Sequence, residues 1–217
     1  MEVMKPLTSR ATRLGREQST ALRAVVDLPA EQSALLTRAY RLRDYVRHLV
    51  VGLGLPGNWE FEAAAMLSHI GFLDLPRDTV VNLCAGGPLS EAERETLTSR
   101  AADGAALLRR LPRLRVVADI IGCQFKPYRD FTGELDFREP AVALGSQMLH
   151  AAGDLDRLLN DGVSQSDALE RMLEHTLEYN PDLLSLLMTF DVTVGCGRCA
   201  TRNGSSLARG RLQNCVQ

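Results

Sequence analysis

Two histidines are the side chains of this sequence whose placement best suits metal chemistry. His69 ends an alanine-rich apolar segment, and His150 lies inside a second apolar segment far along the chain. Two imidazoles and a carboxylate, such as that of Asp74 or Asp154, could together bind one divalent cation. The simpler interpretation, which we prefer, is that both rings are packed or hydrogen-bonded inside the fold.

A cysteine pair near the end of the chain is the second candidate site. Cys196 and Cys199 form a Cys-x-x-Cys turn with adjacent glycines, and Cys215 is the nearest third cysteine. Such a turn can aim two thiolates at one zinc ion, but the site would need a fourth ligand from a histidine or a second chain. Redox exchange is less favoured, because no β-α-β pattern surrounds the pair. We expect free thiols in a flexible tail over 192–217, which is rich in Gly, Arg, Ser and Asn.

Composition restricts the class of protein. The chain has 217 residues, of which 45% are hydrophobic and 24% charged, which is typical of a globular protein. A formal net charge of -2 provides no excess of positive charge for binding nucleic acid. Since no apolar run approaches the ~20 residues that span a bilayer and no signal sequence is recognisable, we expect a cytoplasmic protein without a membrane partner. Five cysteines in that setting are expected to be thiols.

The elements that would position these residues are helices. Apolar residues recur at spacings of three and four from Ala30 to Leu53, with Arg38, Arg41 and Arg47 on the opposite face, which we expect to be solvated. Ser90 and Glu93 form a capping box at the start of another helix. No segment alternates like a strand, so the sequence predicts an all-α helical bundle.

The second half of the chain continues the same pattern. We expect helices over 141–159, 168–178 and 183–190, after a surface loop over 125–140 that contains Pro127 and Gly133. The predicted organisation is an N-terminal helical extension (1–28), one helical domain (29–191) and the cysteine-containing tail (192–217).

Several segments, in the same order, resemble one known family. The stretch AAAMLSHIGFLDLPRDTVVNL, continued by CAGGPLSEAERETL, resembles the centre of the HD-GYP cyclic-dinucleotide phosphodiesterases, which reads roughly LLHDIGKIGIPDAILNKPGPLTEEE. The segments SRAADGAALLRRLPRLRVVADII and AVALGSQMLHAAGDLDRL are also similar to that family. The resemblance covers 38–187 and implies an HD-domain-like helical bundle. It also implies hydrolysis of cyclic di-GMP by iron or manganese ions that His and Asp side chains hold.

The positions that carry ligands in that family differ here. They fall on residues that have all changed type: Arg38, Ser68, His69, Arg100, Gln124, Phe125 and Gly153. Two have become arginines, whose fixed positive charge opposes a metal cluster. The family's Gly-Tyr-Pro loop falls on 130–134, DFTGE, and is lost as well. The resemblance therefore implies a degenerate, non-catalytic member without a cofactor.

Two classes of function follow from the sequence. The first is a signalling module that acts through a protein partner or self-association, and that binds a cyclic dinucleotide, if at all, through Arg38, Arg100 or Lys126 without cleaving it. The Lys5-Pro6 junction resembles the end of a receiver domain and suggests a two-component system. The alternative is a metal-dependent phosphohydrolase with relocated ligands around His69 and His150.

Overall fold

The part of the chain that the structure describes is all helical, as the sequence predicts. The structure is a computed structural model that describes residues 29–55, 57, 59–131, 140–175 and 177–191, and no strand occurs among them. The helices are α2 (Ala30–Gly52), α3 (Trp59–Leu67), α4 (Arg77–Ala85), α5 (Glu91–Leu108), α6 (Arg115–Gly122), α7 (Pro140–Asn160), α8 (Gln165–Leu173) and α9 (Pro181–Leu187). The predicted N-terminal extension and the tail with Cys196, Cys199 and Cys215 lie outside the described residues.

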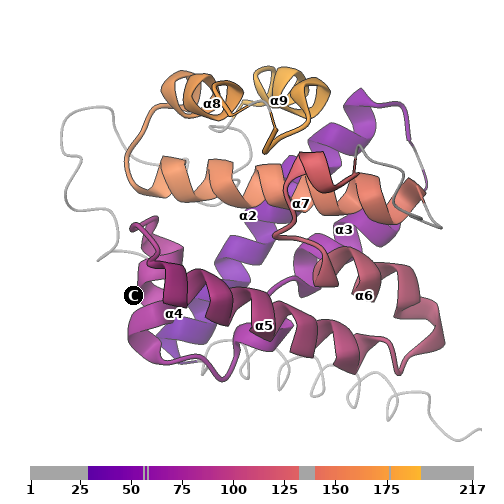
Figure 1. Ribbon diagram of the computed structural model, residues 1–217, viewed down its shortest axis with the longest axis vertical. Helices are drawn as coiled ribbons and strands as arrows, with labels where there is room; N and C mark the ends of the chain where they lie inside the picture. Colours follow the sequence, from indigo (N-terminus) through magenta and orange to yellow (C-terminus); the bar gives the residue numbers. More distant parts are fainter. Residues whose placement is uncertain (1–28, 56, 58, 132–139, 176, 192–217) are drawn as a thin grey trace, which may run out of the picture.

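Helices α2 and α7 form the middle of the bundle. Figure 1 shows α7 running across the molecule, with α8 and α9 above it and α5 and α6 below. Helix α2 packs against α3, α4, α7 and α9. The main core contains residues from nearly every helix, among them Leu49, Ile120 and Leu155, which are wholly buried. The two central helices are therefore surrounded on most sides, and their polar residues need partners inside the protein.

One face of α2 differs from the sequence prediction. Arg47 is half exposed and pairs with Glu62, which agrees with the predicted solvated face. Arg38, however, is only 5% exposed, so its assignment to a solvated face is wrong. The reason is that α2 is enclosed by α4 and α7 at this level, which a helical period cannot reveal.

A close crossing of two chain segments fixes the turn after α3. His69 leads into a 3-10 helix, Ile70–Phe72, that packs on α5. A Cβ atom on Gly71 would lie 1.9 Å from the carbonyl oxygen of Arg100, and one on Gly104 would lie 2.9 Å from the Gly71 nitrogen. Only glycine at both positions permits this approach, which places the turn against the helix.

The start of α5 is confirmed. Ser90 is the N-cap residue, and its hydroxyl accepts a hydrogen bond from the Glu93 amide at 3.2 Å. The Glu93 carboxylate accepts from the Ser90 amide at 2.8 Å and completes the capping box. These two contacts satisfy amides at a helix end that has no intrahelical partner for them.

The last helices follow the prediction in number and differ in length. Helix α8 ends at Leu173, so the prediction of helix through 178 is wrong. The carbonyl oxygens of Leu177 and Glu178 instead accept hydrogen bonds from the amides of Arg129 and Tyr128, at 2.9 and 2.8 Å. This tertiary pairing brings the segment between α8 and α9 next to the chain that follows α6.

Candidate functional site

A buried arginine occupies the centre of the candidate site. Nη1 of Arg38, on α2, donates to Asp156 Oδ2 at 2.7 Å and to the carbonyl oxygen of Leu83 at 3.3 Å. Nη2 donates to the carbonyl oxygen of Gly153 at 3.0 Å, and Nε donates to Nε2 of His69 at 3.2 Å. One guanidinium thus joins α2, α4, α7 and the end of α3.

Asp156 is the anion of this site, and its side chain is wholly buried. Besides Arg38, it accepts hydrogen bonds from Nε of Arg41 at 2.5 Å and from Nη2 of the same side chain at 3.1 Å. Removing a buried carboxylate from such a pair leaves an uncompensated charge, which is far more unfavourable than losing a surface pair. Two arginines on successive turns of α2 are therefore fastened to one residue of α7.

His69 takes part as a hydrogen-bond acceptor. Since Nε of an arginine always carries a proton, Nε2 of His69 must be unprotonated. The ring proton then lies on Nδ1, which donates to Oγ of Ser68 at 3.1 Å, and this hydroxyl donates to the carbonyl oxygen of Ala65 at 2.8 Å. Burial, followed by the charges of Arg38 and Arg41, holds the pKa of His69 well below its usual range. The imidazole is neutral, and its lone pair is engaged by a cation that belongs to the protein.

A small cavity of about 60 Å³ lies beside this network. Gln124 is 7% exposed at the cavity and donates from Nε2 to the Ser68 carbonyl oxygen at 3.3 Å. Phe125 stacks on Phe72 with ring centroids 6.5 Å apart. The lining residues are Arg38, Leu42, His69, Phe72, Leu83, Leu89, Gln124, Phe125, Leu149, His150, Gly153, Asp154 and Arg157. The volume suffices for a few water molecules and is well below the ~300–1,000 Å³ of ordinary ligand pockets.

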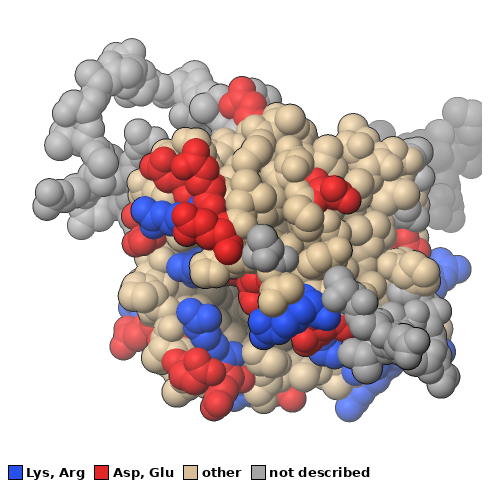
Figure 2. Space-filling model, turned by 45° about the horizontal axis from the view of Figure 1, so that its top comes forward, with Lys and Arg blue, Asp and Glu red and all other residues tan. Residues whose placement is uncertain are grey.

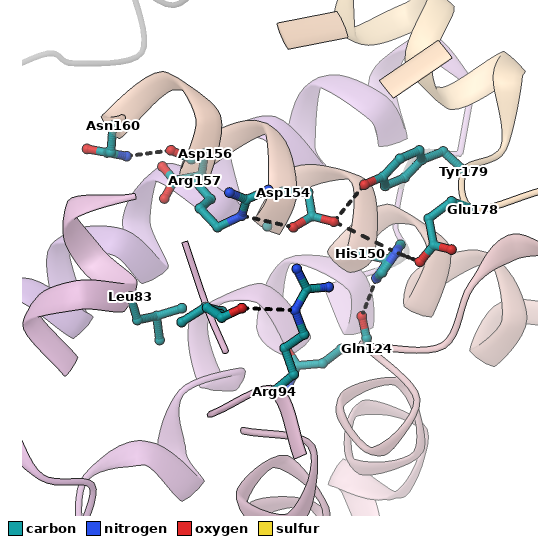
Figure 3. A network of polar contacts seen from close by, with 12 residues as sticks. Leu83, Arg94, Gln124, His150, Asp154, Asp156, Arg157, Asn160, Glu178 and Tyr179 are labelled. Carbon is teal, nitrogen blue, oxygen red and sulfur yellow. Dashed lines mark hydrogen bonds and ion pairs between the residues drawn. The ribbon is translucent and has the colours of Figure 1, made fainter. Parts of the chain in front are cut away.

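A second polar group lies at the same cavity, around His150 (Figure 3). Nδ1 of His150 is 3.2 Å from the carbonyl oxygen of Gln124, and Nε2 is 3.1 Å from Oε1 of Glu178. Tyr179 stacks on the ring and donates from its hydroxyl to Asp154 at 2.8 Å. The ring thus faces two acceptors, which is the arrangement that a doubly protonated imidazolium fits.

The charges around His150 agree with this protonation. Burial lowers the pKa of His150, but the Glu178 hydrogen bond and the negative charges of Asp154 and Glu178 outweigh burial, so that the net shift is upward. The hydrogen bond to His150 in turn lowers the pKa of the Glu178 carboxyl. Nε2 of His150 also lies 3.9 Å from Oδ2 of Asp154. His150 therefore lies between two carboxylates, which favour its protonated form.

The structure brings together most of the positions that the resemblance singled out. Arg38, His69, Gln124, Phe125 and Gly153 all line the cavity, and Ser68 lies directly behind it. These residues come from segments far apart in the sequence, so their convergence follows from the helical packing.

Three sequence candidates lie elsewhere. The Arg100 side chain is 43% exposed and lies 3.6 Å from Asp103 on its own helix. Lys126 is exposed, and Asp74 is exposed too; none of the three lines the cavity. Of the two carboxylates considered as partners for the histidines, only Asp154 reaches the site.

Sequence reasoning missed Asp156, Glu178 and Tyr179. Asp156 had a usable signal, because it lies four residues after Ala152 on the apolar stripe of its helix. A carboxylate on a buried stripe requires a cationic partner. Glu178 and Tyr179 gave no such signal, because the segment between α8 and α9 is placed by its backbone contacts to Tyr128 and Arg129.

The residues around the cavity do not fit a metal cluster. Within the described part of the chain, no group of three or more His, Cys, Asp or Glu side chains is arranged to hold a metal ion. His69 offers its lone pair to Arg38, and the guanidinium adds a fixed positive charge where a divalent cation would have to lie. These residues therefore do not support a metal-dependent reaction at the cavity.

Comparisons with known proteins give one match. The family model of the HD domain matches residues 23–183. Curated proteins and solved structures give no match.

Proposed function

Because this chain belongs to the HD-domain family, we propose that it is a regulatory HD domain that signals through a protein partner or self-association without hydrolysing a phosphodiester. In finer terms, we propose a degenerate relative of the HD-GYP phosphodiesterases. The observation that carries the proposal is the guanidinium of Arg38, which is hydrogen-bonded to His69, Asp156 and a carbonyl oxygen of α7.

The physical argument rests on charge and on satisfied hydrogen bonds. A divalent metal site needs side chains that present lone pairs toward a central point. Here the lone pair of His69 and a carboxylate oxygen of Asp156 point toward Arg38. Among the described residues, every buried side-chain nitrogen and oxygen atom has a hydrogen-bond partner. The protein's own cation thus takes the electrostatic role that a metal ion would have.

Metal content and turnover test the proposal directly. The full chain is purified without chelators, its iron and manganese are quantified, and hydrolysis of cyclic di-GMP is measured. We expect less than stoichiometric metal and no turnover. Stoichiometric metal together with turnover would overturn the proposal.

A restored variant supplies the matched comparison. Ser68→His with His69→Asp returns the family pattern at the end of α3, yet Arg38 still occupies the centre. We expect this double variant to remain metal-free and the triple variant with Arg38→His to gain metal affinity, with circular dichroism as the check on folding. Metal binding by the double variant would mean that Arg38 does not block the site.

Binding of a cyclic dinucleotide without cleavage is a subordinate form of the same proposal. The cavity of about 60 Å³ is far too small to enclose a dinucleotide, so such a ligand would lie at its mouth. Calorimetric titration with cyclic di-GMP distinguishes the forms, since a receptor gives saturable heat and a pure interaction module gives none.

The second candidate function is a metal-dependent phosphohydrolase with relocated ligands. It is favoured by the single cavity that His69, His150 and Asp154 share. For such an enzyme, His69→Ala would abolish metal binding and turnover. Unchanged metal content and unchanged turnover after that substitution would leave the regulatory proposal standing.

A further inference from the structure

The turn between α5 and α6 carries a concentrated positive charge. Four arginines, Arg109, Arg110, Arg113 and Arg115, lie within seven residues and are all exposed. Arg109 pairs with Asp119 at 2.8 Å. No hydrogen bond or ion pair to another described residue engages the other three side chains. We call the exposed residues Leu107 to Arg115 of this turn the basic tip; Figure 1 places it at the lower right corner of the molecule.

Helix stabilisation accounts for only half of these charges. Arg109 and Arg110 follow the carboxyl end of α5, where positive charge interacts favourably with the helix dipole. Arg113 and Arg115 lie at the amino end of α6, where positive charge is unfavourable, and the first turn of that helix contains no acidic residue. Arg113 and Arg115 therefore do not stabilise the helix that follows them.

Two large apolar side chains lie among the arginines. Leu107 is 52% exposed and Leu111 is 53% exposed. They are four positions apart in the sequence, with Leu107 in the last turn of α5 and Leu111 just beyond the end of that helix. Half-exposed leucines flanked by unpaired arginines combine the two features by which a protein surface attaches to an anionic lipid layer.

Exposed carboxylates gather at α8, on the other side of the molecule from the basic tip. Asp167 and Glu170 of α8 and Glu174 directly after it are exposed, and Figure 1 places α8 at the upper left. Figure 2 shows a group of carboxylates at the upper left of its face, and basic groups together with further carboxylates in the lower half. A chain with a net charge of -2 would thus approach a negative surface with the basic tip forward.

We propose that the basic tip binds the surface of an anionic phospholipid bilayer, with its arginines against the lipid phosphates and Leu107 and Leu111 in the outer acyl region. None of the described helices is long and apolar enough to cross a membrane, and this attachment requires none. A bilayer takes up two leucines on a projecting turn without a preformed recess, which a protein partner would have to supply. The attachment does not depend on the regulatory function proposed above.

Vesicle sedimentation tests the proposal with the full chain. Vesicles of phosphatidylcholine and phosphatidylserine in equal parts are compared with vesicles of phosphatidylcholine alone. We expect the protein to sediment with the anionic vesicles only, and less so as salt is raised, because exposed charges are screened. Equal sedimentation with both vesicles, or none with either, overturns the proposal. Binding of duplex DNA in the absence of vesicle binding also overturns it and assigns the tip to nucleic acid.

Matched variants locate the contact. With roughly fivefold in affinity for each arginine near the lipid surface, Arg110→Glu with Arg113→Glu should weaken binding at least about 25-fold. Leu107→Ser with Leu111→Ser should weaken it while leaving its salt dependence intact. Arg77→Glu with Arg171→Glu makes the same charge change at exposed positions of α4 and α8 and should leave binding nearly unchanged. An equal loss in that control would overturn the assignment to the tip.

Discussion

His69 and His150 line the same cavity and have opposite electrostatic surroundings. His69 lies next to Arg38, and burial and the arginine charges lower its pKa. His150 lies next to Glu178 and Asp154, which raise its pKa in spite of burial. The pKa of a buried histidine in this cavity therefore depends on the charges of its neighbours. One ring accepts a hydrogen bond inside an arginine network, and the other connects α7 to the segment before α9 through Glu178.

The largest expected effect comes from Asp156, the buried carboxylate that pairs with Arg38. Asp156→Ala leaves the buried guanidinium of Arg38 without its carboxylate and should lower the free energy of unfolding by about 3–5 kcal/mol. Urea denaturation followed by circular dichroism measures the change. Asp119→Ala removes the exposed pair with Arg109 and should lower it by less than about 1 kcal/mol. Similar losses in the two variants would contradict the buried character of the Arg38 network.

The acceptor role of His69 gives the next largest effect. His69→Ala leaves the Nε–H group of Arg38 without an acceptor in a buried site and should lower the free energy of unfolding by roughly 1–3 kcal/mol. His69→Gln retains an oxygen that can accept this hydrogen bond and should recover a large part of the loss. If both variants were equally destabilised, packing of the His69 ring would contribute more to the free energy of unfolding than the hydrogen bond to its lone pair.

The two histidines should change the free energy of unfolding in opposite directions as the pH is varied. His69 should give the larger change, on the acid side. Its folded-state pKa lies well below the ordinary 6.5, so the unfolded chain binds the proton first as the pH falls. The stability that the neutral ring contributes is present above pH 6.5 and is lost as the pH falls toward the folded pKa. The free energy of unfolding, measured by urea denaturation at several pH values between neutral and acid, should therefore fall less for His69→Gln than for the wild type.

His150 should act in the opposite direction and less strongly. Its folded-state pKa lies above 6.5, so its contribution is complete below pH 6.5 and is lost as the pH rises through the folded pKa. In His150→Gln this decline on the alkaline side should be absent. Proton-detected titration of the ring signals checks the assignment independently. The same direction of shift for both rings would remove the basis of the comparison.

The smallest expected effect comes from removing the hydroxyl of Tyr179, which binds Asp154 beside His150. Tyr179→Phe keeps the ring that stacks on His150 and removes the hydroxyl that donates to Asp154 at 2.8 Å. The loss should be about 0.5–1.5 kcal/mol in the free energy of unfolding. A loss above that range would mean that Asp154 depends on this hydroxyl more than on Arg157.

Several features of the bundle were predictable from local rules. The period of α2, the capping box at Ser90 and Glu93, and the absence of strands follow from spacing and side-chain chemistry within a few residues. The end of α8 was not predictable in this way. The segment that follows it is held by hydrogen bonds from Tyr128 and Arg129 to the carbonyl oxygens of Glu178 and Leu177, which lie some fifty positions later in the chain, and tertiary contacts of this kind override local propensity.

The helical class and the resemblance to the HD-GYP family follow from the sequence, as do the residue types at 38, 68, 69, 124, 125 and 153. What those residues do together depends on how the helices pack. The burial of Arg38 depends on α4 and α7 closing over α2, and its charge is compensated by Asp156 from a helix more than a hundred residues away. Protonation of a histidine follows from the charges and burial around it, and these exist only after the helices have packed.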